Sequence, residues 1–195
     1  MGNTKEEILT VALHLFARDG YEAVSVSRIA GELGMTKGAL YRHYQNKRDL
    51  FEHIVKRMEQ GDSEQAEENN VPEEEMEKNP EKYQETTMED FLEYSKSMFK
   101  YWTEDDFASS FRKMLTLEQF RNEEMQGLYQ QYLASGPVEY VKDLFRNMDI
   151  VDADYKAVRF YAIMYLYYSI YDGAQDKEKV IRQLETALNE MIREF

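Results

Sequence analysis

Proline and glycine, the residues that most often interrupt helices, are scarce in this chain. Its 195 residues include 3 Pro and 9 Gly. Proline lacks a backbone amide hydrogen and glycine loses the most conformational freedom on folding, so a chain with few of either can form long helices. Hydrophobic residues make up 43% of the sequence, which is enough for a packed core. No stretch alternates apolar and polar residues over the length of a strand. We therefore predict an all-α fold.

The charge is divided unevenly along the chain. The formal net charge of −14 argues against binding to a polyanion such as DNA. Residues 1–58, however, carry nine Lys or Arg and seven Asp or Glu, a net charge of +2. The remaining residues carry 15 and 31, a net charge of −16. Because salt screens exposed charges beyond roughly 8–10 Å, the local charge decides what the N-terminal part can bind.

Four short helices are predicted in this N-terminal part. The second and third should cover residues 26–33 and 37–44, separated by a tight turn at Gly34. Two helices joined by such a turn are typical of a helix-turn-helix, which lays the second of them in the major groove of DNA. Each predicted helix starts at a side chain that can accept a hydrogen bond from its first turn. These side chains are Thr4, Ser25, Thr36 and Asn46.

The sequence of residues 4–55 resembles the TetR family of bacterial regulators. The matching runs are SVSRIA at 25–30, LGMTKGALYRHY at 33–44 and NKRDLF at 46–51. The resemblance implies a three-helix helix-turn-helix DNA-binding domain, followed by a helical ligand-binding and dimerisation domain. It also implies a cytoplasmic repressor that binds double-stranded DNA at a palindromic operator.

The resemblance also implies roles for individual residues. Ser25 and Tyr41 would contact phosphate, and Lys47 would contact the DNA backbone through its amide and its ammonium group. Leu40 and Tyr44 would pack inside. Phenylalanine is usual at the second of these positions, so the tyrosine hydroxyl would reach either a phosphate or a buried partner. Four residues would lie nearest the base edges: Thr36, Lys37, Gly38 and Ala39. Three would make more variable contacts: Ser27, Arg42 and His43.

The domain boundaries follow from these helices and from a change in composition. We predict a DNA-binding domain at residues 1–46 and a regulatory and dimerisation domain at residues 47–195, connected by the fourth helix. Residues 59–90 contain 13 acidic residues and two lysines. Such a segment cannot bury much apolar surface, so residues 61–86 are predicted to be an acidic linker or loop.

The last two predicted helices indicate a homodimer. Residues 154–171 are apolar nearly all round, and a helix without a polar face is buried on every side. In a chain this small, the core can cover one side and a second subunit the other. Residues 176–195 carry a single apolar stripe. By the resemblance, the two helices of each subunit form a four-helix bundle. A single monomeric core is the alternative.

A small-molecule effector is expected in the second domain, on the resemblance alone. An aromatic residue at helical spacing belongs to a core more often than to a pocket. The 15 tyrosines of the chain would suit an amphipathic or cationic aromatic ligand. The candidate lining residues are Tyr94, Met98, Trp102, Phe111, Phe120, Tyr129 and Tyr165.

Several other functions are not expected. The three histidines are scattered and cysteine is absent, so no metal site or cofactor is predicted. No Ser/His/Asp set or Gly-rich phosphate loop indicates an enzyme. No apolar run or signal pattern indicates a membrane. Two alternatives stay open: a constitutive DNA-bound architectural or cell-division factor, and a protein-interaction module that uses the acidic segment.

Overall fold

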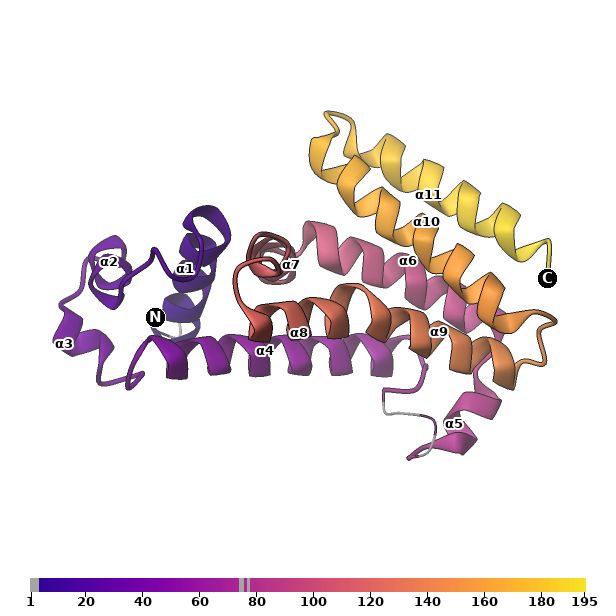
Figure 1. Cartoon of the computed structure of the whole chain (residues 1–195), viewed down its shortest axis with the longest axis horizontal. Coiled ribbons are helices and arrows are strands. Elements are labelled where there is room, and N and C mark those ends of the chain that lie inside the picture. The colour runs from indigo at the N-terminus through magenta and orange to yellow at the C-terminus, as the bar shows by residue number, and fades with distance from the viewer. Residues whose placement is uncertain (1–3, 74–75, 77) are drawn as a thin grey trace. The chain divides into compact units, whose positions relative to one another are not determined.

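The fold was examined in a computed structural model that describes residues 4–73, 76 and 78–195. Every regular element of these residues is an α-helix, which confirms the predicted all-α class (Figure 1). The chain divides into two compact units. Unit 1 comprises Met1–Gly61 and Asp105–Tyr129, and unit 2 comprises Asp62–Glu104 and Gln130–Phe195. None of the helices in the described residues is both long and apolar enough to cross a membrane.

Unit 1 is built around its first helix. It contains α1 (Thr4–Asp19), α2 (Val26–Glu32), α3 (Lys37–Leu40), most of α4 (Lys47–Glu68), α7 (Asp106–Glu118) and the start of α8 (Glu123–Leu133). Six apolar side chains of α1 are buried. Helix α1 packs against both α2 and α7. The buried side chains are Ile8, Leu9, Ala12, Leu13, Leu15 and Phe16.

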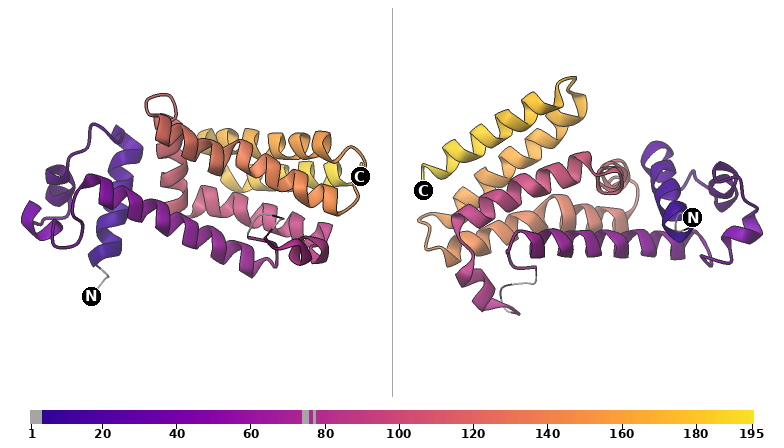
Figure 2. Two further views of the ribbon diagram at one scale, coloured as in Figure 1. Left: turned by 60° about the horizontal axis from the view of Figure 1, so that its bottom comes forward. Right: turned by 180° about the vertical axis from the view of Figure 1, so that it is seen from behind.

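Unit 2 is a helical layer centred on α10. It contains α5 (Pro80–Glu85), α6 (Met88–Glu104), α9 (Ser135–Asn147), α10 (Ala153–Gly173) and α11 (Lys177–Ile192), with the ends of α4 and α8. Helix α10 packs against α6, α9 and α11, and runs antiparallel beside α11 (Figure 1, Figure 2). The ring of Phe160 lies 4.9 Å from that of Phe91 and 5.9 Å from that of Phe145, centroid to centroid. This aromatic cluster joins α6, α9 and α10.

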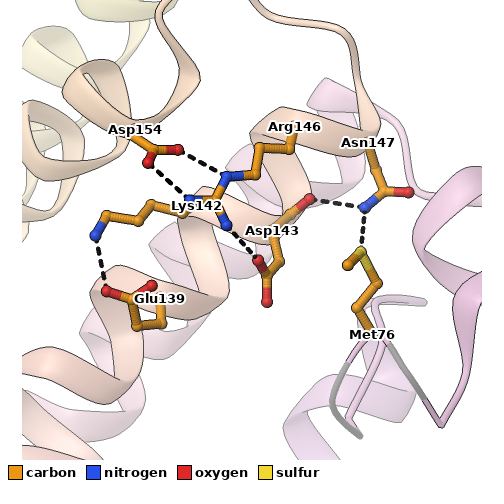
Figure 3. A network of polar contacts seen from close by, with 7 residues as sticks. All are labelled: Met76, Glu139, Lys142, Asp143, Arg146, Asn147 and Asp154. Carbon is orange, nitrogen blue, oxygen red and sulfur yellow. Dashed lines mark hydrogen bonds and ion pairs between the residues drawn. The ribbon is translucent and has the colours of Figure 1, made fainter.

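A polar network fastens the end of α9 to the start of α10 (Figure 3). The Arg146 guanidinium donates to both carboxylate oxygens of Asp154 at 2.7 Å, and also bonds to Asp143 at 3.1 Å. These hydrogen bonds raise the pKa of Arg146 and lower that of Asp154. The turn between the helices holds Asp149 and Asp152 in left-handed conformations, with φ of 53° and 58°. The bidentate pair therefore bridges a turn whose backbone conformation is itself unfavourable.

The acidic segment at residues 61–86 contains two helical parts. Helix α4 continues to Glu68, and α5 starts at Pro80 with the Asn79 side chain accepting from the Lys82 amide. The Tyr83 side chain is buried, and the Tyr140 hydroxyl donates to the Pro72 carbonyl at 3.1 Å. Residues 74, 75 and 77 lie outside the described residues. The functional boundary at residue 46 stays a prediction, because it divides roles rather than compact units.

Loss of the Phe160 ring should lower the stability of unit 2. Phe160→Ala removes a fully buried ring from the aromatic cluster, and Phe→Ala changes in a core cost about 3–5 kcal/mol. We expect a loss of this size in the free energy of unfolding, measured by urea titration. Lys100→Ala, on the exposed face of α6, is the control and should change it by less than about 0.5 kcal/mol. Equal stability of the two variants would contradict the assigned core.

Candidate nucleic-acid interface

Hydroxyl side chains orient the two helices of the helix-turn-helix. The Ser25 Oγ accepts from the Arg28 amide at 3.2 Å, and the Thr36 Oγ1 accepts from the Ala39 amide at 3.1 Å. Each hydroxyl therefore caps a helix N-terminus, as the sequence predicted. Because the cap uses only a lone pair, each hydroxyl hydrogen can still donate to a phosphate.

The turn between α2 and α3 depends on a glycine. Gly34 has a φ of +63°, a left-handed conformation that costs a residue with a Cβ about 1–2 kcal/mol. The Gly34 amide donates to the Gly31 carbonyl and the Met35 amide donates to the Ala30 carbonyl, which closes the end of α2. The chain then enters α3 at Lys37.

The third helix is shorter than the predicted residues 37–44. Regular α3 ends at Leu40, and the following residues form a turn. The amides of Arg42 and His43 bond three residues back, to the carbonyls of Ala39 and Leu40. Such bonds tighten the last turn of a helix. Tyr41, Arg42 and His43 are therefore displayed by a turn rather than by the helix itself.

Leu40 and Tyr44 hold this segment from inside, as expected. Both side chains are buried. Of the two partners left open for the Tyr44 hydroxyl, the structure selects a buried one, because the hydroxyl donates to the Lys5 carbonyl at 3.1 Å. The ring also contacts His53 edge to face. Burial, and secondarily the nearby carboxylates of Glu6 and Asp49, raise the pKa of Tyr44 to about 12.

Seven of the ten predicted DNA-contacting residues are exposed, unlike the buried Leu40 and Tyr44. The Lys37 ammonium lies 5.5 Å from the centre of the Tyr41 ring, so two of the predicted DNA-contacting side chains are neighbours. Two classes of exposure occur among the ten predicted residues. Exposed are Ser25, Ser27, Thr36, Lys37, Gly38, Tyr41 and Arg42, and half-buried are Ala39, His43 and Lys47.

The ammonium group of Lys47 is held by the loop between α1 and α2. Its Nζ donates to the Tyr21 carbonyl at 3.0 Å and lies 4.2 Å from the centre of the Tyr21 ring. The Glu22 carboxylate is 3.6 Å away. The resemblance assigned this ammonium to DNA, whereas in the structure it fastens the loop to the start of α4.

The start of α4 is capped and partly neutralised. The Asn46 side chain accepts from the Asp49 amide at 2.9 Å, and the Asp49 carboxylate accepts from the Gln45 amide at 2.7 Å. The Arg48 guanidinium bonds to both Glu52 and Glu124. These bonds raise the pKa of Arg48. Because two carboxylates share it, Arg48 contributes less positive charge to the surface than Lys37 or Arg42.

Known proteins match the same part of the chain. The family profile described as bacterial regulatory proteins, tetR family, matches residues 8–54. The HTH-type transcriptional regulator AcrR of Shigella flexneri is 45% identical over 51 residues, 26% of this chain and 24% of that protein. The helix-turn-helix segment of this chain is of the TetR-family type. The alignment with this curated relative spans about a quarter of the relative's length.

Solved structures extend the TetR-family likeness to the fold of nearly the whole chain. A transcriptional regulator of the TerR/AcrR family from Aquifex aeolicus has a TM-score of 0.73 at 18% identity. The match covers 97% of this chain and 99% of that one. A complex of SmeT with triclosan has a TM-score of 0.68 at 18% identity, with 97% and 90% coverage. At such identities the likeness concerns the fold.

The candidate effector residues of this chain fall into both units. In unit 2, Tyr94, Met98 and Trp102 share one face of α6, where burial and the charge of Asp62 raise the pKa of Tyr94. Tyr165, on α10, is 48% exposed. In unit 1, two of the remaining candidates are buried and one is not. Phe111 and Tyr129 are buried, and Phe120 is 87% exposed in the turn after α7.

Removal of the Tyr44 hydroxyl should leave DNA binding intact and change the response to alkali. An unfolded tyrosine ionises near pH 10, so folding favours the neutral ring and the wild type loses stability between pH 10 and about 12. Tyr44→Phe should lose less over this range, measured by urea titration at stepped pH. At pH 7 it should lose about 1 kcal/mol at most, because the Lys5 carbonyl can bond to water. Parallel pH curves for the two proteins would contradict this assignment.

Proposed function

We propose that this protein is a ligand-responsive transcriptional repressor that binds a palindromic operator as a homodimer. Three parts of the proposal rest on different observations: the outward face of the helix-turn-helix, the outer face of α10, and the aromatic residues of unit 2. The first of these carries the proposal.

The outward face of the helix-turn-helix has the chemistry that DNA requires. Residues 34–48 contain no acidic residue, and the basic side chains of Lys37 and Arg42 are exposed there. Hydroxyl, ammonium and guanidinium donors are exposed together around the N-terminus of α3, while the buried Leu40 and Tyr44 hold that segment in place. Donors on a fixed backbone can contact phosphates and base edges at the same time. This arrangement favours DNA binding over the protein-interaction alternative, which places the contact in the acidic segment.

The outer face of α10 supports a dimer. The inner face of α10 is buried and includes Phe160 and Met164. Its outer face exposes apolar side chains at helical spacing, of which Leu166 is 57% exposed. A contiguous apolar stripe of this kind typically marks a protein interface. The stripe consists of Tyr155, Val158, Tyr165, Leu166 and Ile170.

The effector is supported by the fold and by the aromatic face of α6. A structural neighbour, SmeT, was solved with triclosan, an aromatic molecule. Tyr94, Met98 and Trp102 could contact a ligand of that class. A ligand that prefers a dimer with different spacing of the two α3 segments would weaken operator binding. A hundredfold preference corresponds to a coupling of about 2.7 kcal/mol.

Selection from random duplex DNA tests the function directly. The full-length protein should enrich a palindromic site whose half-sites lie about one helical turn apart, or a multiple of it. Gel shifts on the enriched duplex, at fixed salt, then identify aromatic compounds that release it. Recovery of no enriched site would exclude a sequence-specific regulator, and enrichment without any releasing compound would favour a constitutive DNA-bound factor.

Loss of an outward lysine should weaken binding in a salt-dependent way. Lys37→Ala should reduce affinity for the selected duplex and lower the slope of log K against log salt by about one, because one positive charge at the DNA surface is lost. Lys113→Ala removes the same charge from an exposed position on α7 and is the matched control, with an unchanged slope expected. Identical slopes for the two variants would exclude the Lys37 ammonium from the DNA-contacting surface.

A charge on the outer face of α10 should separate the subunits. Leu166→Arg places a guanidinium within the apolar stripe, and an unpaired charge is costly to bury in an interface. We expect sedimentation at micromolar concentration to show a monomer with weakened operator binding. Glu104→Arg, at an exposed position of α6, is the control and should stay dimeric. A dimer of Leu166→Arg as stable as the wild type would place the interface elsewhere.

A further inference from the structure

A buried carboxylate in unit 1 is not among the predicted DNA-contacting residues. Glu118 is the last residue of α7, and it is 2% exposed. Burial of a carboxylate is costly unless hydrogen bonds satisfy its oxygens. The hydrogen-bond partners of Glu118 therefore indicate its structural role.

Glu118 bonds to the loop that leads into the helix-turn-helix. Its Oε1 accepts from the Tyr21 amide at 3.1 Å and from the Arg121 guanidinium at 3.3 Å. The hydrogen bond from the Tyr21 amide joins residues that are 97 positions apart in the sequence. Charge-assisted bonds of this kind are stronger than those between neutral groups. The carboxylate thus ties the end of α7 to the loop between α1 and α2.

The same loop residue is held from a second side. The Tyr21 carbonyl accepts from the Lys47 ammonium at 3.0 Å, so an acidic group binds its N–H and a basic group binds its C=O. The Tyr21 ring contacts those of Phe16 and Phe51, with centroid distances of 5.0 and 5.3 Å. Side chain and backbone of this residue are therefore both fixed.

The neighbouring glycine shows how closely the carboxylate approaches the loop. Gly20 has a φ of +89°, and a Cβ built on it would lie 2.7 Å from the Glu118 Oε1. Such a separation is shorter than any normal contact of a Cβ atom. The loop backbone and the carboxylate are therefore packed against each other with no room for a side chain between them.

We propose that Glu118 is a positioning residue for DNA binding. Glu118, on α7, binds the Tyr21 amide, and Lys47, on α4, binds the Tyr21 carbonyl. Together these two hydrogen bonds fix the path of the chain into α2 and the position of the exposed donors around α3. The inference rests on the proposed DNA-binding function. It extends that function to a residue outside the helix-turn-helix, on α7.

Two substitutions at Glu118 separate its reach from its charge. Glu118→Gln keeps the length and one acceptor oxygen, whereas Glu118→Asp keeps the charge but is one methylene too short to reach the Tyr21 amide. We expect Glu118→Gln to bind the selected duplex within about threefold of the wild type. Glu118→Asp should bind about tenfold more weakly, the effect of losing one charge-assisted bond. Glu123→Gln, a carboxylate exposed near the start of α8, is the control and should bind like the wild type.

A double substitution tests whether Glu118 acts through Tyr21. In a Lys47→Met background the hydrogen bond to the Tyr21 carbonyl is already lost. Glu118→Asp should then reduce DNA affinity by less than threefold. All affinities are measured well below the unfolding temperature of each variant. Equal affinity of Glu118→Asp and wild type would overturn the proposal. So would an inverted order, with Glu118→Gln weaker than Glu118→Asp, because the charge alone would then matter.

Hydrogen exchange of the Tyr21 amide keeps this test independent of DNA. The amide should be protected in the wild type and in Glu118→Gln, and should exchange at least tenfold faster in Glu118→Asp. If no duplex is recovered by selection, the proposed function fails. This measurement still reports whether Glu118 fixes the Tyr21 amide. Unchanged protection in Glu118→Asp would show that the carboxylate does not fix the loop.

Discussion

Burial of α1 is the constraint on which the N-terminal unit depends. Six apolar side chains of this helix must be covered, and the helix-turn-helix offers only the seven residues of α2 and the four of α3. Helix α7, more than eighty residues further along the chain, supplies the missing cover. The predicted DNA-binding surface is therefore built on a core to which a distant part of the chain contributes.

This dependence explains where the polar groups of unit 1 are found. Hydroxyl caps at Ser25 and Thr36 orient the short helices locally. The loop between α1 and α2 has no regular structure to satisfy its backbone, so Glu118 and Lys47 bind the two sides of Tyr21. Each of these bonds fixes backbone rather than contacting a ligand, which leaves the outward donors near α3 available for DNA.

Local features were predictable because they depend on residues a few positions apart. The caps, the turn at Gly34 and the inward side of Leu40 and Tyr44 all follow from spacing within one or two helical turns. The end of α3 at Leu40 was not predicted. The turn that follows it keeps hydrogen bonds like those of a helix, and no residue type in the sequence marks the change. The acidic segment was interpreted as a loop, although two parts of it are helical. Ala66, Val71 and Tyr83 are buried there, which shows that a charged segment can still pack through its few apolar side chains.

By itself, the sequence determined the all-α class, the helix-turn-helix and the TetR-family resemblance, since these reside in periodicity and in a contiguous motif. Only the tertiary structure decided which partner the Tyr44 hydroxyl takes and what holds the Lys47 ammonium. It alone revealed Glu118, because a glutamate at the end of a helix is normally solvated and nothing in its sequence neighbourhood indicates burial. The bond between Glu118 and Tyr21 joins residues 97 apart, and such a pairing arises from the packing of α7 on α1.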